Sequence, residues 1–375
     1  MTLPLLTIAS GNYIAHARAL ASSYLAHHPS AQVFLCLVDR PPPGFESAHE
    51  PFTVLLAEDL SIPGWTHLAF RYDIVELNTA VKPFALSHLC RAYGFDRVLY
   101  LDPDIVIYDS LDPLEALLAT HSIVLTPHLL SPVPSEHPGF EQVLLQYGAC
   151  NLGFFAARWG PNVEALLRWW QIRLLRYCIR DPGRGFWVDQ KWMDLAPCFF
   201  PGTYVWRDPA CNVAWWNFGE RVVTEREGRF FVAGTPLRFA HFSGFNMEDH
   251  DVVTSRSKRV GLGDVSDGAR RLLEQYRSRL FAHGYAEACQ YPYAYGRFDD
   301  GTAITDDIRL TYRELDPAGE RWPNPFETGS GTFHEHWMTP RTRLGRLAHS
   351  ALGGARYQSL VDGIRWLRGQ PPASG

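Results

Sequence analysis

The sequence lacks the cysteine patterns of extracellular and zinc-binding proteins. Its 375 residues include seven cysteines, and no two of them form a Cys-x-x-Cys pair. They are Cys36, Cys90, Cys150, Cys178, Cys198, Cys211 and Cys289. Scattered cysteines of this kind indicate reduced, mostly buried thiols rather than a disulfide framework or a zinc site, and they favour a cytoplasmic protein.

Long apolar segments are also missing. No run approaches the length of about 20 residues that a membrane-spanning helix needs. No Lys or Arg precedes the apolar start of the chain, and His16 and Arg18 interrupt the segment after it. A signal peptide is therefore not expected, and Leu3–Ala9 is predicted to form a first β-strand.

Two signals of ligand binding are absent. The phosphate-binding patterns G-x-G-x-x-G and G-K-[ST] follow none of the early strands, so a bound nucleotide must be held by another device. The formal net charge is -5, and no long basic stripe runs through the body of the chain. An extended nucleic acid is therefore not the expected partner, and a small ligand is favoured.

The sequence does contain an alternation of strand-like and helix-like segments through its first half. This rhythm predicts an α/β fold with a doubly wound sheet. Pro83 falls inside one predicted helix, where we expect a turn boundary or a kink. The predicted strands are Leu3–Ala9, Gln32–Val38, Phe52–Ala57, Arg97–Leu101, Ile123–Thr126 and Asn151–Ala157, and the predicted helices are Tyr13–Ala26, Ile74–Tyr93, Leu111–Ala119 and Val163–Tyr177.

A pair of aspartates follows the fourth predicted strand. Asp102 and Asp104 come directly after the apolar segment Val98–Leu101, at the edge of the sheet where side chains converge on a cleft. Two carboxylates there form a hard-oxygen site for Mn²⁺ or Mg²⁺ that leaves positions for diphosphate oxygens and water. Asp249 and Asp251 have the same spacing without a preceding strand, so spacing alone is weak evidence. The alternative is a capping or turn role.

The segment around these aspartates resembles the metal-binding strand of glycosyltransferase family 8 and its divergent bacterial relatives. The similar segments are Thr79-Ala-Val-Lys-Pro-Phe84, Val98-Leu-Tyr-Leu-Asp-Pro-Asp-Ile105, Asp109-Ser-Leu-Asp-Pro-Leu114, Cys150-Asn-Leu-Gly-Phe154, Asp189-Gln190 and Ala240-His-Phe-Ser-Gly244. Several ordered motifs are much harder to obtain by chance than one. The resemblance implies a GT-A type doubly wound mixed sheet with a Rossmann-like nucleotide-binding half and a mainly helical C-terminal extension.

The resemblance also implies roles for individual residues. It makes His241 the third metal ligand beside Asp102 and Asp104, and it places Lys82 against the diphosphate, where it would neutralise the leaving group. Asp189 and Gln190 would bind donor-sugar hydroxyls and line the reaction centre. The other implied donor-binding residues are Ala9, Ser10 and Tyr13 near the nucleoside, Asn151 and Gly153 against the sugar, and Gly244. Plainer alternatives stay open: a strand cap for His241, a solvated helix position for Lys82, a core position for Tyr13 and ordinary turns for the rest.

One position departs from the family pattern. The family continues from its His-x-x-Gly to a lysine and Pro-Trp, whereas Gly244 is followed by Phe-Asn-Met. The lysine that would bind the diphosphate from this turn is absent. Arg256, Lys258 or Arg259 could supply the charge, or Lys82 could act alone, and a divergent bacterial branch is therefore favoured.

These expectations describe a metal-dependent glycosyltransferase for bacterial surface glycan synthesis. It would move a sugar from a nucleotide-sugar, with a UDP-sugar favoured, to a glycan, a lipid-linked sugar or a protein. Family-like enzymes retain the anomeric configuration, and a diphosphate oxygen helps to remove the acceptor proton. If the enzyme inverts, Asp189 or Asp194 is the first candidate for a general base.

Two other functions remain open. A haloacid-dehalogenase-type phosphatase also has an apolar strand followed by Asp-x-Asp, with Asp102 as the nucleophile, but that fold normally opens with the motif, whereas here the motif begins only at residue 98. A sugar-binding module without turnover is the second alternative. It would use the aromatic residues Phe186, Trp187, Trp192, Trp206, Trp215 and Trp216. Phosphomonoester turnover would support the phosphatase, and Mn²⁺-dependent donor hydrolysis would exclude the binding module.

The chain is expected to divide near residue 250. Residues 1–250 would form the catalytic domain, with the nucleotide-sugar half over 1–110 and the acceptor half over 111–250, and residues 251–375 would form the extension. The tail is expected to form a terminal helix docked on its own protein, and the alternative is a basic amphipathic helix that contacts the inner face of the membrane peripherally. The tail carries Arg341, Arg343, Arg346, Arg356, Arg365 and Arg368 against Asp362 alone.

Overall fold

The computed structural model describes residues 3–134, 139–249, 252–257 and 260–338. The basic tail and its predicted helix, together with Asp251, Lys258 and Arg259, lie outside these residues. Within them, no helix combines the length and the apolar character needed to cross a membrane. All seven cysteines are described and none is in a disulfide; five are buried, Cys198 is exposed and Cys289 is partly exposed.

The chain forms two compact units. The first comprises Met1–Leu68 and Tyr72–Tyr295, and the second comprises Ala69–Arg71 and Gly296–Gly375. This division falls later than the boundary that we expected near residue 250. The difference arises because two helices beyond residue 250, α9 (Asp267–Ala282) and α10 (Tyr285–Ala288), pack against α1 (Ile14–His27) and belong to the first unit.

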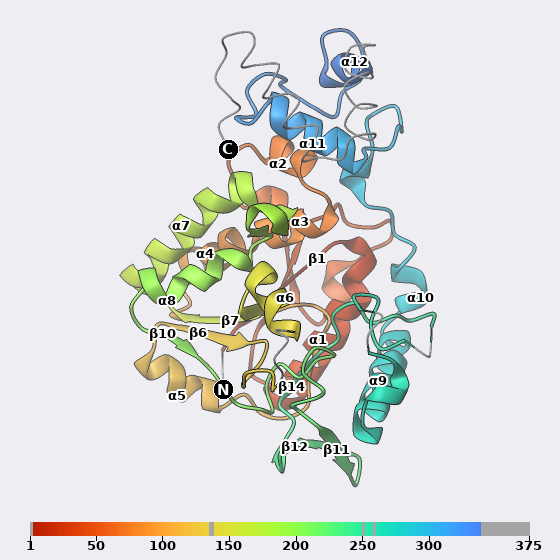
Figure 1. Cartoon of the computed structure of the whole chain (residues 1–375). Coiled ribbons are helices and arrows are strands. Elements are labelled where there is room, and N and C mark those ends of the chain that lie inside the picture. Colours follow the sequence, from red (N-terminus) through yellow and green to blue (C-terminus); the bar gives the residue numbers. More distant parts are fainter. Residues whose placement is uncertain (1–2, 135–138, 250–251, 258–259, 339–375) are drawn as a thin grey trace. The chain divides into compact units, whose positions relative to one another are not determined.

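A seven-stranded mixed sheet forms the centre of the first unit (Figure 1). Its order is β10-β6-β7-β4-β1-β2-β3, and neighbouring strands are parallel except at β7, which runs antiparallel to β4 and β6. The strands are β1 (Leu5–Ala9), β2 (Val33–Leu37), β3 (Thr53–Leu56), β4 (Arg97–Leu101), β6 (Ile123–Pro127), β7 (Cys150–Arg158) and β10 (Thr203–Val205). The predicted doubly wound mixed sheet is confirmed.

Helices cover both faces of this sheet. Leu99 and Leu101 of β4 belong to an apolar core with α1 and α5, whereas Phe155 of β7 packs on Trp170 of α7 at the opposite face. Figure 1 shows α4 and α7 on one side of the sheet and α1 on the other. The helices are α1 (Ile14–His27), α2 (Trp65–Arg71), α3 (Ile74–Ala80), α4 (Lys82–Ala92), α5 (Pro113–Thr120), α6 (Gly139–Tyr147), α7 (Pro161–Tyr177), α8 (Ala196–Phe199), α9 (Asp267–Ala282) and α10 (Tyr285–Ala288).

The single helix predicted over Ile74–Tyr93 is in fact two helices. Asp73 and Glu76 form a capping box that starts α3, which ends at Ala80. Pro83 lies in the first turn of α4, where its missing N–H group leaves no helical hydrogen bond unmade. The break makes Lys82 the first residue of α4, close to the carboxyl end of β4.

Shorter elements complete the first unit. The strands β5 (Ile105–Ile107) and β14 (Phe239–His241) form an antiparallel pair. Strands β11 (Val223–Arg226), β12 (Arg229–Val232) and β13 (Thr235–Pro236) form a meander, and β8 (Arg180–Asp181) pairs with β9 (Phe186–Trp187). The 3-10 helices are Gly11–Tyr13, Ser47–His49, Ala57–Asp59, Pro182–Arg184, Lys191–Leu195 (η5), Leu262–Asp264 and Ala294–Gly296.

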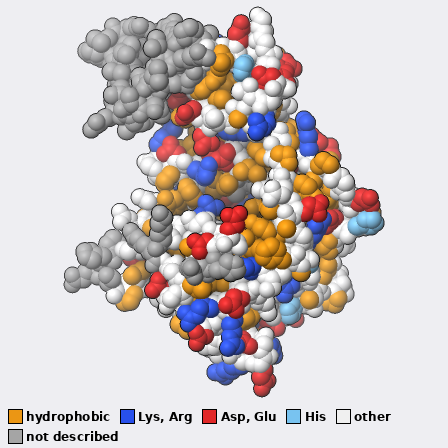
Figure 2. All heavy atoms as spheres, turned by 90° about the vertical axis from the view of Figure 1, so that its right-hand side faces the viewer, with side chains coloured by type: hydrophobic (Ala, Val, Ile, Leu, Met, Phe, Trp, Pro, Cys, Tyr) orange, Lys and Arg blue, Asp and Glu red, His pale blue; other side chains and the backbone are white. Residues whose placement is uncertain are grey.

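The surface seen in Figure 2 carries basic and acidic side chains interspersed with hydrophobic ones. Charges of opposite sign also meet within the first unit, where Arg271 of α9 forms an ion pair with Glu225 of β11. Such a mixture gives no single sign of charge to that face.

The second unit is helical, as predicted for the C-terminal extension. It contains α11 (Asp306–Leu315) and α12 (Phe333–Met338). Its small core is mainly aromatic, with Phe70, Phe298, Ile304, Ile308, Tyr312, Trp322, Phe333 and Trp337. The buried Arg309 guanidinium donates to the carbonyl oxygens of Ala69 and Phe70, which fixes the short segment Ala69–Arg71 within this unit.

Candidate metal and donor site

Three candidate metal ligands converge where β4, β5 and β14 meet. Asp102 follows β4, Asp104 precedes β5, and His241 is the last residue of β14. Because β14 pairs with β5, His241 lies opposite Ile105, and the next residue, Phe242, donates its N–H to the carbonyl oxygen of Asp104 at 2.8 Å. The strand pairing thus joins the aspartates to a histidine that is distant in the sequence.

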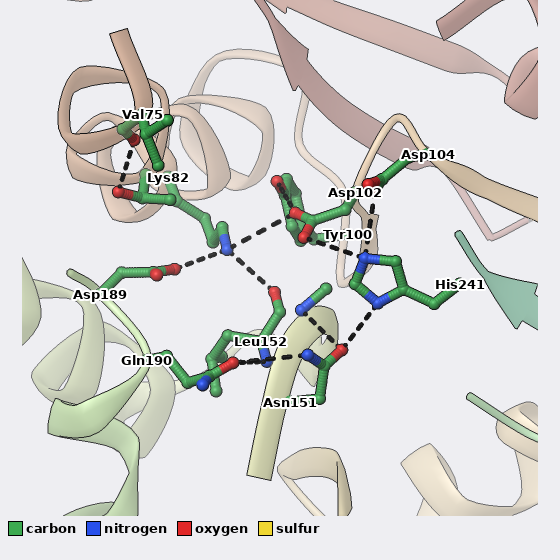
Figure 3. A network of polar contacts seen from close by, with 12 residues as sticks. Val75, Lys82, Tyr100, Asp102, Asp104, Asn151, Leu152, Asp189, Gln190 and His241 are labelled. Atoms are coloured by element: carbon green, nitrogen blue, oxygen red, sulfur yellow. Dashed lines mark hydrogen bonds and ion pairs between the residues drawn. The ribbon is translucent and has the colours of Figure 1, made fainter. Parts of the chain in front are cut away.

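The geometry of this cluster fits one divalent cation (Figure 3). The Nε2 atom of His241 lies 3.1 Å from Asp104 Oδ1 and 3.7 Å from Asp102 Oδ2. One ligand atom of each residue lies within 4.8 Å of the others, which is about twice a metal–ligand bond of roughly 2.1–2.4 Å. Carboxylate oxygens with one imidazole nitrogen suit Mn²⁺ or Mg²⁺.

Asn151 holds the other ring nitrogen of His241. Its Oδ1 atom lies 3.0 Å from His241 Nδ1 and also accepts the N–H of Gly153 at 3.2 Å. A protonated Nδ1 leaves the lone pair of Nε2 directed at the aspartates, which is the usual arrangement of a metal-binding histidine. The sequence suggested Asn151 as a sugar contact and gave no sign that it orients His241.

Gly153 allows β7 to approach this histidine. A β-carbon at Gly153 would lie 2.5 Å from His241 Cε1 and 2.8 Å from Asn151 Oδ1, so only glycine fits without displacing them. The Gly153 carbonyl oxygen also accepts the N–H of Asp102 at 2.8 Å. β7 is irregular here, because its pairing with β6 shifts between Leu125 and Thr126, as is common beside active sites.

The electrostatics of the cluster favour positive charge. Burial raises the pKa of Asp104, but the charge and hydrogen bond of His241 outweigh it, and the pKa lies below its ordinary value. Burial lowers the pKa of His241, but Asp104 and then Asp102 outweigh it, and the pKa lies above its ordinary value. The two carboxylates thus stabilise a cation at the position of the imidazole edge, which is where a metal ion would bind.

Lys82 and Asp189 form a buried ion pair next to the cluster. The Lys82 Nζ atom lies 2.5 Å from Asp189 Oδ2, and the two side chains are 1% and 2% exposed. The ammonium group also donates to the Leu152 carbonyl oxygen at 2.9 Å and lies 4.0 Å from Asp102 Oδ1. Lys82 is therefore not a solvated helix residue, and Figure 3 shows its ammonium group between Asp189 and Asp102.

Asp189 and Gln190 are held by a strained turn. Val188 has φ 40°, which is a rare conformation for a β-branched residue and costs on the order of 1–3 kcal/mol. The Trp170 indole N–H donates to the Asp189 carbonyl oxygen at 3.2 Å. Gln190 accepts the N–H of Leu152 at 3.1 Å and donates to the Tyr147 carbonyl oxygen at 2.9 Å. Burial raises the pKa of Asp189, and the Lys82 ammonium lowers it by less.

The predicted nucleoside residues follow β1. Ala9 ends the strand, and the Ser10 hydroxyl donates to Asn12 Oδ1 at 2.9 Å. Tyr13 stacks on His16 with ring centroids 4.1 Å apart and is 37% exposed, so it is not a core residue. Burial raises the pKa of Tyr13 to about 12, Asp104 adds to the rise and Arg256 opposes it.

Gly244 lies in a turn that is covered by Arg256. Gly244 has φ +67°, and a β-carbon there would lie 2.5 Å from Arg256 Cγ. The Ser255 N–H donates to the Gly244 carbonyl oxygen at 2.7 Å, which folds the segment back onto the turn. The Arg256 guanidinium has no hydrogen bond or ion pair with any other residue that the structure describes. Among the described residues it is thus a cation without a partner, next to the turn at Gly244 that lacks the family's lysine.

Tyr100 belongs to the site, although no motif in the sequence indicated a role for it. Its hydroxyl donates to Asp102 Oδ1 at 2.5 Å, and the Lys82 ammonium lies 4.2 Å from the centre of its ring. The period of two residues along β4 could have indicated this contact, since it places Tyr100 and Asp102 on the same face. Trp216 also packs edge-on against His241, with centroids 5.4 Å apart.

Comparison with known proteins gives a limited result. No family model matches the chain, so membership of family 8 stays a prediction. Two proteins of Bacillus subtilis (strain 168), described as uncharacterized, are similar in sequence: YfnF is 28% identical over 177 residues (47% of this chain), and YfnD is 30% identical over 172 residues (44%). The chain spans only 58% and 53% of the lengths of these two relatives.

Several solved structures of glycosyltransferases are similar at low identity. The galactosyltransferase LgtC, in complex with donor and acceptor sugar analogues, has 15% identity and a TM-score of 0.41 over 75% of this chain and 96% of its own. GlyE of Streptococcus pneumoniae TIGR4 has 14% identity and a TM-score of 0.40 over 80% and 67%. Mouse xyloside xylosyltransferase 1 has 15% identity and a TM-score of 0.39 over 64% and 97%. Scores of this size are too low to carry a functional argument.

Proposed function

We propose that this chain is a metal-dependent glycosyltransferase that uses a nucleotide-sugar donor, with a UDP-sugar favoured. The observation that carries the proposal is the cluster of Asp102, Asp104 and His241 at the carboxyl end of the sheet, beside the buried pair of Lys82 and Asp189. Bound Mn²⁺ or Mg²⁺ would stabilise the negative charge that develops on the diphosphate leaving group.

Each residue of the site has a distinct task in this proposal. Asp102, Asp104 and His241 hold the cation, and Asn151 and Gly153 keep His241 in position. Asp189 and Gln190, fixed by Lys82 and Leu152, would meet the donor sugar. Lys82 donates hydrogen bonds to Asp189 and Leu152 and lies 4.0 Å from Asp102, so it would position these groups and keep the local field positive.

Arg256 would supply the missing charge for the diphosphate. Its guanidinium lies next to Gly244 and has no hydrogen bond or ion pair within the described part of the chain. It is also close enough to Tyr13 to influence the same hydroxyl as Asp104. A planar guanidinium can bind phosphate oxygens in a bidentate manner. The exposed ring of Tyr13, together with Ala9 and Ser10, would contact the nucleoside.

A retaining reaction is favoured because the candidate bases are already occupied. Asp189 forms an ion pair with Lys82, and Asp194 forms one with Lys191 at 2.8 Å and accepts the N–H of Ala149 at 2.9 Å. A carboxylate held in this way is a poor general base for an inverting attack. The acceptor proton would then leave with a diphosphate oxygen, and the acceptor would be a glycan, a lipid-linked sugar or a protein.

A panel of nucleotide-sugars tests the proposal directly. Thermal unfolding would be measured with UDP- and GDP-sugars, with and without Mn²⁺, followed by donor hydrolysis for each ligand that raises the midpoint. We expect the unfolding midpoint to rise, and the donor to be hydrolysed, only when both the sugar-nucleotide and the metal are present. Chelator should abolish both effects. Turnover of simple phosphomonoesters, or binding without hydrolysis in Mn²⁺, would contradict it.

A further inference from the structure

An exposed apolar surface lies over α6, α7, η5 and α8 of the first unit. Its members, Leu145, Ile172, Tyr177, Leu195 and Phe199, are five of the eleven large hydrophobic residues that are exposed among the described residues. Ile172 is 55% and Phe199 53% exposed. Single exposed hydrophobic side chains are ordinary, but a gathering of them marks an interaction surface. We call this surface the α7–α8 face.

Aromatic contacts join these elements into one surface. The Trp169 ring of α7 lies 6.0 Å from the Phe199 ring of α8 and 6.1 Å from the Trp192 ring of η5, measured between centroids. Tyr177 stacks on Phe186 at 5.4 Å. The Lys191 ammonium donates to the Leu145 carbonyl oxygen at 2.7 Å, which attaches α6. In Figure 1, α7 and α8 lie next to each other at the left edge of the first unit.

The same face carries arginines that have no ionic partner in the described part of the chain. Along α7, Ala165, Arg168, Ile172 and Arg176 form an exposed row at intervals of three or four residues. Neither these two arginines nor Arg173 has a hydrogen bond or an ion pair with any other described residue.

The neighbouring acidic side chains do not neutralise these arginines. Each acid has its own cationic partner: Glu164 pairs with Arg91, Asp181 with Arg184, and Asp194 with Lys191. The α7–α8 face therefore differs from the mixed surface of Figure 2.

We propose that the α7–α8 face docks the protein on an anionic lipid bilayer. Exposed Ile, Leu, Phe and Tyr side chains beside arginines match the boundary between acyl chains and anionic headgroups. A second copy of the same face would bring arginines against arginines. The tail beyond residue 338 is itself basic, with six arginines and one aspartate from Arg341 to Arg368, so it does not complement the face either. This surface is distinct from the metal and donor site, so the inference does not rest on the proposed function.

Vesicle flotation of the full chain tests the docking surface. The wild type is compared on vesicles of phosphatidylcholine alone and of phosphatidylcholine mixed with phosphatidylglycerol, at low and high salt. The charge variant is R168Q/R173Q/R176Q, and the apolar variant is I172S/F199S. The control is R207Q/R226Q/R229Q, which removes the same charge from exposed arginines elsewhere. Circular dichroism and the thermal unfolding midpoint verify that each variant is folded.

We expect the wild type to bind anionic vesicles in a salt-sensitive manner and neutral vesicles much more weakly. The charge variant should bind at least tenfold more weakly, since each arginine near the surface contributes to attraction. At high salt, binding depends mainly on insertion of apolar side chains into the bilayer, so the apolar variant should bind several-fold more weakly than the wild type. The control should bind as the wild type does. If the charge variant and the control lost vesicle binding equally, the inference would be overturned, because binding would then depend on the net charge of the protein and not on the α7–α8 face. Binding that survives in both test variants would assign it to the tail, and no vesicle binding by the wild type would leave a protein partner as the occupant.

Discussion

The two halves of the candidate site differ in how their charges are balanced. In the half formed by Lys82 and Asp189, the side chains are almost completely buried and form a direct ion pair 2.5 Å long. In the half formed by Asp102, Asp104 and His241, two carboxylates that are 28% and 15% exposed lie around one imidazole at 3.1–3.7 Å. The first half balances its own charges, whereas in the second two carboxylates face a single imidazole.

This difference separates positioning from chemistry. A buried ion pair is costly to break, because removing one partner leaves an uncompensated charge. A partly exposed carboxylate cluster has less influence on stability, but it can bind a metal ion that the fold itself does not require. Loss of Lys82 should therefore be seen mainly in unfolding measurements, and loss of a metal ligand mainly in turnover.

The largest effect is expected for D104N. Loss of this carboxylate should reduce Mn²⁺-dependent donor hydrolysis roughly a thousandfold, or about 4 kcal/mol in the activation barrier. It should also remove the rise in unfolding midpoint that Mn²⁺ causes in the wild type. The exposed Asp96 supplies the control D96N, which should behave as the wild type. A D104N protein with full activity in the presence of chelator would refute the role of the metal half.

The variant K82M should instead act on stability. It leaves the Asp189 carboxylate buried without its partner, and we expect the free energy of unfolding to fall by about 3 kcal/mol, measured with urea. The double variant K82M/D189L should recover much of this loss. As a control, K191M breaks the pair with Asp194, whose members are 23% and 24% exposed, and should cost less than about 1 kcal/mol. Equal losses for K82M and K191M would show that burial does not distinguish the pairs.

The sequence predicted the metal half better than the paired half, for physical reasons. The strand Arg97–Leu101 was predicted with the bounds that the structure has, because a short apolar run that ends at two aspartates is a local pattern. The pairing of Lys82 with Asp189 joins residues far apart in the chain, and no local pattern encodes it. The break between α3 and α4 was ambiguous, since Pro83 is compatible with either a kink or a new helix.

The supporting contacts of His241 were also beyond the sequence. Asn151 and Gly153 were implied as donor-sugar contacts, but their contact with the histidine depends on the register of β7 and its irregular pairing with β6. The positive φ of Val188 could not be predicted from the sequence either, since β-branched residues rarely adopt this conformation. Sequence patterns identify the ligand-bearing strand, whereas tertiary packing decides which groups orient the ligands.

G153A tests the link between the fold and the metal half. The added methyl group meets His241 Cε1, so the imidazole must move away from Asp104. We expect the Mn²⁺ concentration for half-maximal hydrolysis to rise roughly 10- to 100-fold, as for other residues that orient metal ligands. N151A should give a similar but smaller rise, because it removes the acceptor for His241 Nδ1 without a steric clash. G263A, at a position with open space around it, is the control. Unchanged Mn²⁺ titrations for both variants would remove His241 from the coordination sphere.

The smallest effect is expected for R256Q, and it asks whether the metal half extends to the turn at Gly244. The guanidinium lies against this turn and has no partner among the described residues, so its removal should leave the free energy of unfolding nearly unchanged. If it binds the diphosphate, KM for the donor should rise about tenfold, which corresponds to about 1.4 kcal/mol. The Mn²⁺ midpoint measured at saturating donor should stay that of the wild type, because Arg256 contacts none of the three ligands. R256K should recover part of the affinity as a point charge but not the bidentate contact, and R226Q serves as the control for loss of an exposed arginine. A donor KM that is equal in R256Q and R226Q would restrict the positive charge at the diphosphate to Lys82 and the metal.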